Sequence, residues 1–109
     1  MFVIPSNARL FICNYPISMK NSFEGLSSII ENLFPNEIFS GAFFIFLNRT
    51  RTHIKIFAWD NDGFIILYKR LEKGTFKWKW NNIQTLDRRT FLMLFEGIIP
   101  KRLEQRYVR

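Results

Sequence analysis

Four carboxylates are candidates for a catalytic metal site, because clustered carboxylates can hold the divalent ions that many hydrolytic and group-transfer reactions use. They are Asp60, Asp62, Glu72 and Glu96. Asp60 and Asp62 lie within Asp-Asn-Asp-Gly, a stretch whose residue types favour a tight turn. Glu72 falls in a second turn and Glu96 at a helix end, so the spacing predicts no metal site.

Other motifs of catalysis are also missing from the sequence. An EF-hand is excluded after Asp60, because Phe64 and Ile65 stand where that loop requires an oxygen donor and a glycine. His53 and Cys13 are the single residues of their types and are about forty positions apart, so both are predicted to be structural. No glycine-rich phosphate-binding loop occurs. We therefore expect no enzyme activity, catalytic residue, cofactor or metal.

The positive charge is concentrated in the second part of the chain. Sixteen Lys and Arg against nine Asp and Glu give a net charge of +7, and 14 of these cations follow residue 48. Such a field attracts polyanions, although the same excess could serve only to keep an aromatic-rich domain soluble. The predicted polyanion-binding residues are Lys69, Arg70, Lys73, Arg49, Arg51, Lys101, Arg102, Arg106 and Arg109. The alternative is a solvated rim in which Arg70 pairs with Glu72 or Asp62.

The cations near position 70 are predicted to be placed by a meander of strands. Residues 54–59 alternate in polarity, which puts Lys55 on one face with Phe57 and Trp59. A turn at 60–63 leads to a strand ending near Arg70, and a turn at 72–74 leads to a third strand, 75–80. In that strand Phe76, Trp78 and Trp80 are predicted to face the core and Lys77 and Lys79 to face outward; the alternative is an exposed platform on which unpaired bases stack.

The remaining sequence predicts two more strands and two helices. Strands are expected over 9–13 and 42–47, the latter buried on both faces because it is continuously apolar. A helix capped by Asn21 ends before Pro35, and a second, capped by Thr85 or Asp87, ends before Pro100. The fold class is therefore α+β, with an antiparallel sheet of about five strands and two helices packed on it.

Length and composition indicate one globular domain. The 109 residues are 48% hydrophobic, enough to form a core without disulfides, and residues 101–109 form a basic C-terminal tail. The longest apolar run is far too short to cross a membrane, and the N-terminus lacks the features of a signal peptide. A single cysteine suits a reducing compartment, so a cytoplasmic location is expected.

The block from Trp59 to Phe76 resembles a known family. It is similar to the protein encoded by the second reading frame of insertion-sequence sixty-six elements, in which Trp-Asp-x-x-Gly precedes Tyr-Lys-Arg-Leu-Glu-x-Gly-x-Phe; the similarity extends over nearly the whole chain. Here these motifs read Trp59, Asp60, Gly63, and then Tyr68, Lys69, Arg70, Leu71, Glu72, Gly74 and Phe76. The chain departs from the family pattern at 18–21, which reads Ser-Met-Lys-Asn instead of Asp-Met-Arg-Lys.

The resemblance implies a role beside a separately encoded transposase. We therefore expect a non-catalytic accessory protein of transposition that binds DNA at the element ends, or a transposase–DNA complex, through its basic surface. The alternative is an adaptor that contacts only the transposase, or a self-assembly module, without touching DNA.

Overall fold

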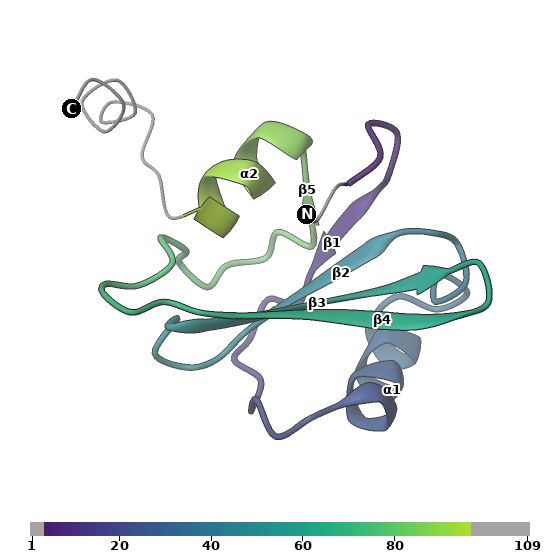
Figure 1. Cartoon of the computed structure of the whole chain (residues 1–109), viewed down its shortest axis with the longest axis horizontal. Coiled ribbons are helices and arrows are strands. Elements are labelled where there is room, and N and C mark those ends of the chain that lie inside the picture. Colours follow the sequence, from purple (N-terminus) through teal and green to yellow (C-terminus); the bar gives the residue numbers. More distant parts are fainter. Residues whose placement is uncertain (1–3, 97–109) are drawn as a thin grey trace.

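A computed structural model describes residues 4–96 of the chain, which form one five-stranded sheet with a helix on each face (Figure 1). The expected α+β class, with five strands and two helices, is confirmed. The elements in chain order are β1 (Leu10–Ile12), α1 (Phe23–Leu33), β2 (Phe43–Leu47), β3 (His53–Asp60), β4 (Gly63–Arg70), β5 (Thr85–Leu86) and α2 (Arg88–Glu96).

The sheet is mixed, not wholly antiparallel as expected. Its strand order is β4-β3-β2-β1-β5, and β2, β3 and β4 form the predicted antiparallel meander. Strand β1 pairs with β2 in parallel, with Leu10 opposite Phe43. The reason is that α1 carries the chain back along the sheet before β2 begins, so both strands run in the same direction. Strand β5, which the sequence did not reveal, pairs antiparallel with β1.

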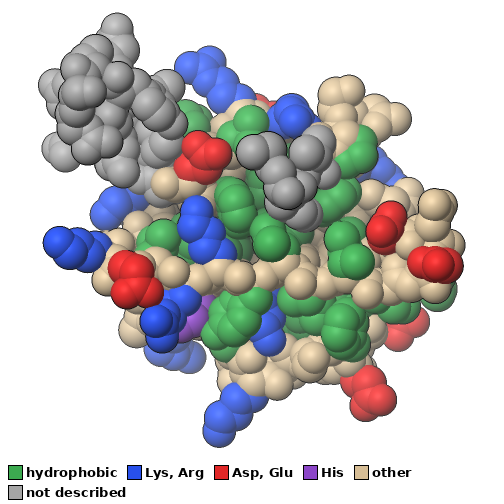
Figure 2. All heavy atoms as spheres, viewed as in Figure 1, with side chains coloured by type: hydrophobic (Ala, Val, Ile, Leu, Met, Phe, Trp, Pro, Cys, Tyr) green, Lys and Arg blue, Asp and Glu red, His purple; other side chains and the backbone are tan. Residues whose placement is uncertain are grey.

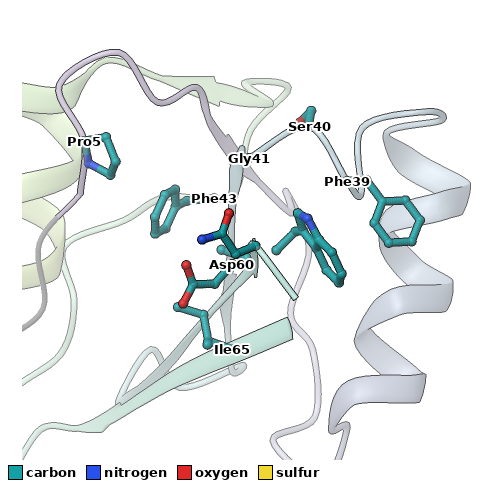
Figure 3. A pocket seen from close by; sticks show the side chains of 10 residues that line it. Pro5, Phe39, Ser40, Gly41, Phe43, Asp60 and Ile65 are labelled. Carbon is teal, nitrogen blue, oxygen red and sulfur yellow. The ribbon is translucent and has the colours of Figure 1, made fainter. Parts of the chain in front are cut away.

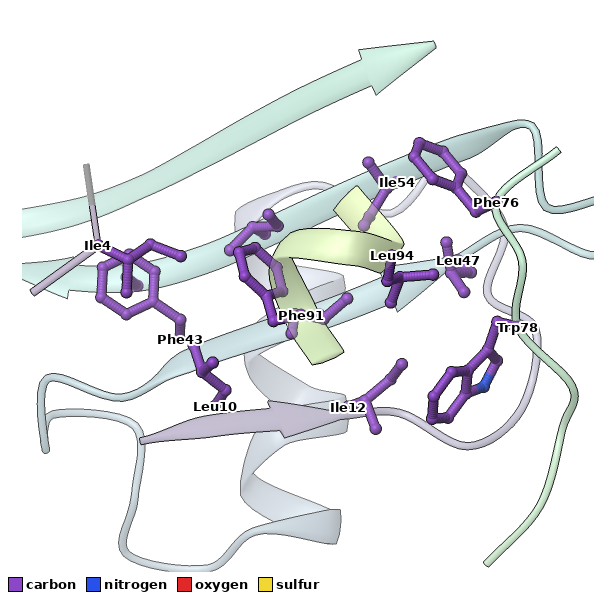
Figure 4. Close-up of a cluster of buried hydrophobic side chains, with 13 residues drawn as sticks. Ile4, Leu10, Ile12, Phe43, Leu47, Ile54, Phe76, Trp78, Phe91 and Leu94 are labelled. Carbon is purple, nitrogen blue, oxygen red and sulfur yellow. The ribbon is translucent and has the colours of Figure 1, made fainter. Parts of the chain in front are cut away.

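Strand β2 is buried on both faces, as its continuous apolar sequence predicted. Alternate residues enter two separate cores: Ile45 lies beneath α2, while Phe44 and Phe46 lie against α1. Figure 4 shows the core on the α2 side, where Phe91 and Leu94 of α2 meet the sheet. A sheet covered on both faces leaves only its strand ends, edges and connecting loops to meet a partner.

The Asp-Asn-Asp-Gly turn is confirmed. Asp60 and Gly63 are paired across the β3–β4 hairpin, and Asn61 has a φ of 61°, a conformation that Asn tolerates well. The second predicted turn is confirmed too, since Gly74 has a φ of 75°, which favours glycine. The two turns close opposite ends of β4, so the eight-residue strand separates them.

The predicted third strand, 75–80, is wrong as a strand, although its side-chain alternation is confirmed. The segment is extended but joins no ladder. Residues 75–80, which we call the crossing segment, cross the sheet instead. The Phe76 N–H donates to the Arg51 carbonyl at 2.7 Å. Phe76 and Trp78 are buried, Trp80 is half-buried and packs against the same core, and both lysines are exposed. Burial of the first two rings rules out the alternative stacking platform for them.

The predicted N-terminal cap is correct for α2 and wrong for α1. Asn21 is not the cap of α1; Ser22 holds that position without a side-chain cap bond, and the Asn21 Nδ2 donates to the Ser18 carbonyl instead. Asp87 is confirmed as the cap of α2, since its Oδ1 accepts the Thr90 N–H at 2.7 Å, whereas Thr85 belongs to β5. Within residues 4–96 we find no helix long and apolar enough to span a membrane.

Candidate nucleic-acid interface

The loop between β2 and β3 meets the end of β4, and this junction gathers cations from distant parts of the sequence. His53 is paired with Arg70, and the Leu71 N–H donates to the Thr52 carbonyl at 2.9 Å. Arg49 on the loop and Lys73 after β4 are both exposed at this end of the sheet. The structure therefore brings together three of the predicted polyanion-binding residues, Arg49, Arg70 and Lys73.

The crossing segment adds two cations that the sequence analysis did not include in the site. Because Phe76 and Trp78 point into the core, Lys77 and Lys79 between and after them point outward. The alternation of aromatic and basic residues was the signal that could have identified them. We call the five exposed cations at this end the basic end; its members are Arg49, Arg70, Lys73, Lys77 and Lys79.

Figure 2 shows that Lys and Arg side chains gather at the left, over the end of β4, with a few acidic side chains among them, whereas Asp and Glu side chains predominate at the right, around the β3–β4 turn. Cations grouped at one end of a rigid sheet produce a stronger local field than the same charges spread evenly over the surface. The basic end therefore presents a compact positive surface.

The β2–β3 loop that carries Arg49 is held by a local hydrogen-bond network. The Asn48 Oδ1 accepts the backbone N–H groups of Thr52 and His53 at 2.9 and 3.0 Å. The His53 Nδ1 lies 2.8 Å from the Thr52 hydroxyl, in agreement with the structural role predicted for this histidine. The loop thus fixes the backbone at Arg49 while leaving its side chain in solvent.

Lys69 was predicted to belong to the binding surface, but its ammonium group is engaged inside the fold. The Lys69 Nζ donates to the Phe95 carbonyl at 3.1 Å and lies 4.5 Å from the centre of the Phe95 ring. A cation near the C-terminal part of a helix is stabilised by the helix dipole. The chief role of Lys69 is therefore to attach α2 to the edge of the sheet.

Arg51 is likewise a structural residue and not the exposed cation that was expected. Its backbone has a φ of 58°, and its Nη1 donates to the Trp78 carbonyl at 2.8 Å. Its Nε is buried. The guanidinium therefore ties the crossing segment to the β2–β3 loop, which leaves little of it free to meet a phosphate.

Arg70 makes the ion pair that the alternative interpretation predicted. Its Nη2 lies 3.1 Å from Glu72 Oε2, with 66% and 81% of the two side chains exposed. Exposed ion pairs contribute little to stability and exchange readily with other partners. Arg70 can therefore be a rim residue in the free protein and a phosphate contact in a complex. The predicted tail cations Lys101, Arg102, Arg106 and Arg109 lie outside the described residues.

The opposite end of the sheet has a different character. A pocket of about 580 Å³ opens there beside the β3–β4 turn, lined by Asp60 with apolar and small residues that include Phe39, Phe43 and Gly41 (Figure 3). The nearby Arg9 is paired with Glu37, so its charge is compensated. This pocket is therefore a weaker candidate for binding a polyanion than the basic end is.

The Arg9–Glu37 pair is expected to make the stability of the fold depend on pH. The hydrogen bond from the Arg9 guanidinium lowers the pKa of Glu37 below its ordinary value. A lowered native pKa stabilises the fold at neutral pH, and this contribution is lost as the pH falls through the native pKa. Replacing Arg9→Gln should return the Glu37 pKa toward its ordinary value, as followed by NMR titration of the carboxyl carbon. An unchanged titration curve would show that the pair does not persist in solution.

The candidate carboxylates do not come together. Asp60 and Asp62 lie at the hairpin turn, and Glu72 lies beyond the far end of β4. Across residues 4–96, no three His, Cys, Asp or Glu side chains form a group that could hold a metal ion. Cys13 is buried in the core on the α1 side, where burial raises its thiol pKa.

Comparison with known proteins gives a family match over most of the chain. The family model described as IS66 Orf2 like protein matches residues 8–105, nearly the whole chain. No curated protein and no solved structure matches the chain. The family model spans all seven helices and strands of the described structure, together with the Trp59–Phe76 block that carries the resemblance.

Proposed function

This chain belongs to the IS66 Orf2-like family, which implies an accessory role in transposition, and from that premise we propose that it binds DNA of its element through the basic end. The family is not known for catalysis, so the proposal is a binding function. The observation that carries it is the convergence of five exposed cations from the β2–β3 loop, the β4 terminus and the crossing segment on one end of the sheet.

The geometry suits phosphate contacts. Cations bind a DNA backbone best when the scaffold fixes their spacing, since less conformational freedom is then lost on binding. Arg49 follows the Asn48 network, and Lys77 lies between two residues anchored in the core. Such contacts position a protein on DNA without reading its sequence, so we propose that sequence preference, if present, comes from the transposase or from DNA shape.

A protein adaptor for the transposase is the second candidate, and one observation favours it. Phe39 is 64% exposed and stacks edge-on against Trp59, with 5.1 Å between the ring centres, at the end of the sheet opposite the basic end. An exposed aromatic side chain such as Phe39 is common where proteins meet. The two candidates therefore use opposite ends of the molecule and can be tested separately.

The salt dependence of DNA binding tests the proposal. Replacing Arg49→Gln and Arg70→Gln together should weaken binding and lower the slope of log affinity against log salt by up to about two units, because each lost phosphate contact removes nearly one released counterion. The measurement is fluorescence anisotropy with element-end DNA and unrelated DNA at several salt concentrations.

The matched control replaces Arg9→Gln and Arg89→Gln. Each pair of variants contains one arginine in a surface ion pair and one other exposed arginine, and each removes two charges. The control should keep the wild-type slope, since Arg9 is paired with Glu37 and Arg89 lies on α2, and neither belongs to the basic end. Equal slopes for the two double variants would reject the basic end as the binding surface. Loss of transposase capture with unchanged DNA binding would favour the adaptor function.

A further inference from the structure

Strand β4 is a long open edge of the sheet. It lies last in the strand order, and within residues 4–96 no strand pairs with its outer side. The Leu71 N–H bonds to Thr52, which fixes the ladder: odd-numbered residues of β4 bond to β3, and even-numbered residues direct their N–H and C=O groups outward. The outward-directed residues are Phe64, Ile66, Tyr68 and Arg70. The other edge, β5, has only two residues.

From Gly63 to Tyr68, the β4 edge lacks the features that usually prevent strands of two molecules from pairing. Natural edges are protected by charges, proline, bulges or very short strands. From Gly63 to Tyr68, β4 contains no charged residue and no proline, and its register with β3 is unbroken over eight residues. Ile65 is 39% exposed and Tyr68 is 52% exposed. The edge is therefore apolar, regular and long enough to accept another strand.

The charges at the two ends of β4 complement each other. The turn before the strand carries Asp60 and Asp62, and residues 69–73 carry three cations and one acid. When two copies of the strand pair antiparallel, the acidic turn of each lies against the basic terminus of the other. Parallel pairing would place like charges together, which is unfavourable.

We propose that β4 pairs antiparallel with β4 of a second copy of this chain, forming a dimer with a continuous ten-stranded sheet. A register centred on Ile66 places most residues of the strand opposite a suitable partner. Phe64 of each copy faces Tyr68 of the other, Ile65 faces Leu67, and Arg70 faces Asp62. Aromatic, aliphatic and oppositely charged cross-strand pairs of this kind stabilise sheets. A two-fold axis makes every such contact occur twice.

The oligomeric state of the full chain tests this proposal without any DNA. Sedimentation between about 1 μM and about 1 mM covers the range expected of a modest interface. Arg70→Glu and Asp62→Lys should each weaken the dimer about tenfold, because each variant places like charges opposite each other at both symmetric positions. An equimolar mixture of the two variants should regain the dimer, since the mixed pair restores opposite charges at both positions. Arg89→Glu reverses an exposed charge on α2, outside both the β4 edge and the basic end, and should sediment as wild type.

Hydrogen exchange identifies the surface independently. The outward amides of Ile66 and Tyr68 should become more protected as concentration rises, whereas the Leu67 amide, bonded to β3, should be protected throughout. A chain that stays monomeric to about 1 mM would overturn the proposal. So would a dimer that is insensitive to both charge reversals and leaves the Ile66 amide unprotected. Protection that appears only when the transposase is added would assign the edge to that protein instead.

Discussion

Replacing Trp78→Ala is expected to lower the free energy of unfolding by about 3–5 kcal/mol, because it removes a large ring from the core beneath α2. Trp78 is 9% exposed and belongs to the same buried cluster as Phe76 and Phe91 (Figure 4). Its carbonyl also accepts the hydrogen bond from Arg51. The measurement is urea unfolding monitored by far-ultraviolet circular dichroism.

Two further substitutions separate packing from other causes. Trp78→Phe should cost less, about 1–3 kcal/mol, since the smaller ring leaves a smaller cavity and the Trp78 Nε1 has no hydrogen-bond partner within residues 4–96 to lose. Lys77→Ala, at the adjacent exposed position, should change stability by no more than about 0.5 kcal/mol. Similar small effects at 77 and 78 would show that the crossing segment is not packed on the sheet.

Replacing Lys55→Met is expected to lower the free energy of unfolding by about 2–3 kcal/mol, through loss of hydrogen bonds to a charged donor. The Lys55 Nζ donates to the carbonyl groups of Met19 at 2.9 Å and Asn21 at 2.7 Å, and it lies 4.9 Å from the centre of the Tyr68 ring. Methionine preserves the length and most of the packing of the side chain. Thermal and urea unfolding provide the measurement.

The control for this substitution is Lys79→Met, which removes the same charge at an exposed position and should leave stability within about 0.5 kcal/mol of wild type. Lys55 is only 7% exposed, so its ammonium group was taken from water when the chain folded. If Lys55→Met is as stable as wild type or more so, that desolvation cost outweighs the two hydrogen bonds. Loss of order confined to 13–22 in the variant would show that Lys55 mainly anchors this segment.

Lys55 shows that a correct local pattern does not decide whether a face is exposed. The alternation of β3 correctly placed Ile54, Ile56 and Ala58 on one face and Lys55 and Phe57 on the other. The sequence predicted that this face carries basic and aromatic residues together, without saying what covers it. In the structure α1 and the segment before it cover that face, so Phe57 is core and the Lys55 ammonium group is bound by backbone carbonyls.

At the basic end, too, the sequence predicted where the cations gather but not which of them are exposed. Charge counts and the turn residues around β4 were enough to predict that Arg49, Arg70 and Lys73 gather in one place, because hairpin connections keep neighbouring strands adjacent. The counts could not separate these residues from Lys69 and Arg51. Whether a cation meets solvent or a carbonyl depends on α2 and the crossing segment, which reach β4 and the β2–β3 loop only in the folded chain.

The sequence by itself determined the local structure: the β3–β4 hairpin, the doubly buried β2, the two helices and the inward row of Phe76 and Trp78. Residue types at short spacing control these features through backbone preferences and periodicity. Tertiary structure alone decided the parallel pairing of β1 with β2, the short β5, the path of the crossing segment and the cations left free. These depend on contacts between residues far apart in the chain, whose stability comes from burial and from satisfying polar groups that no local pattern encodes.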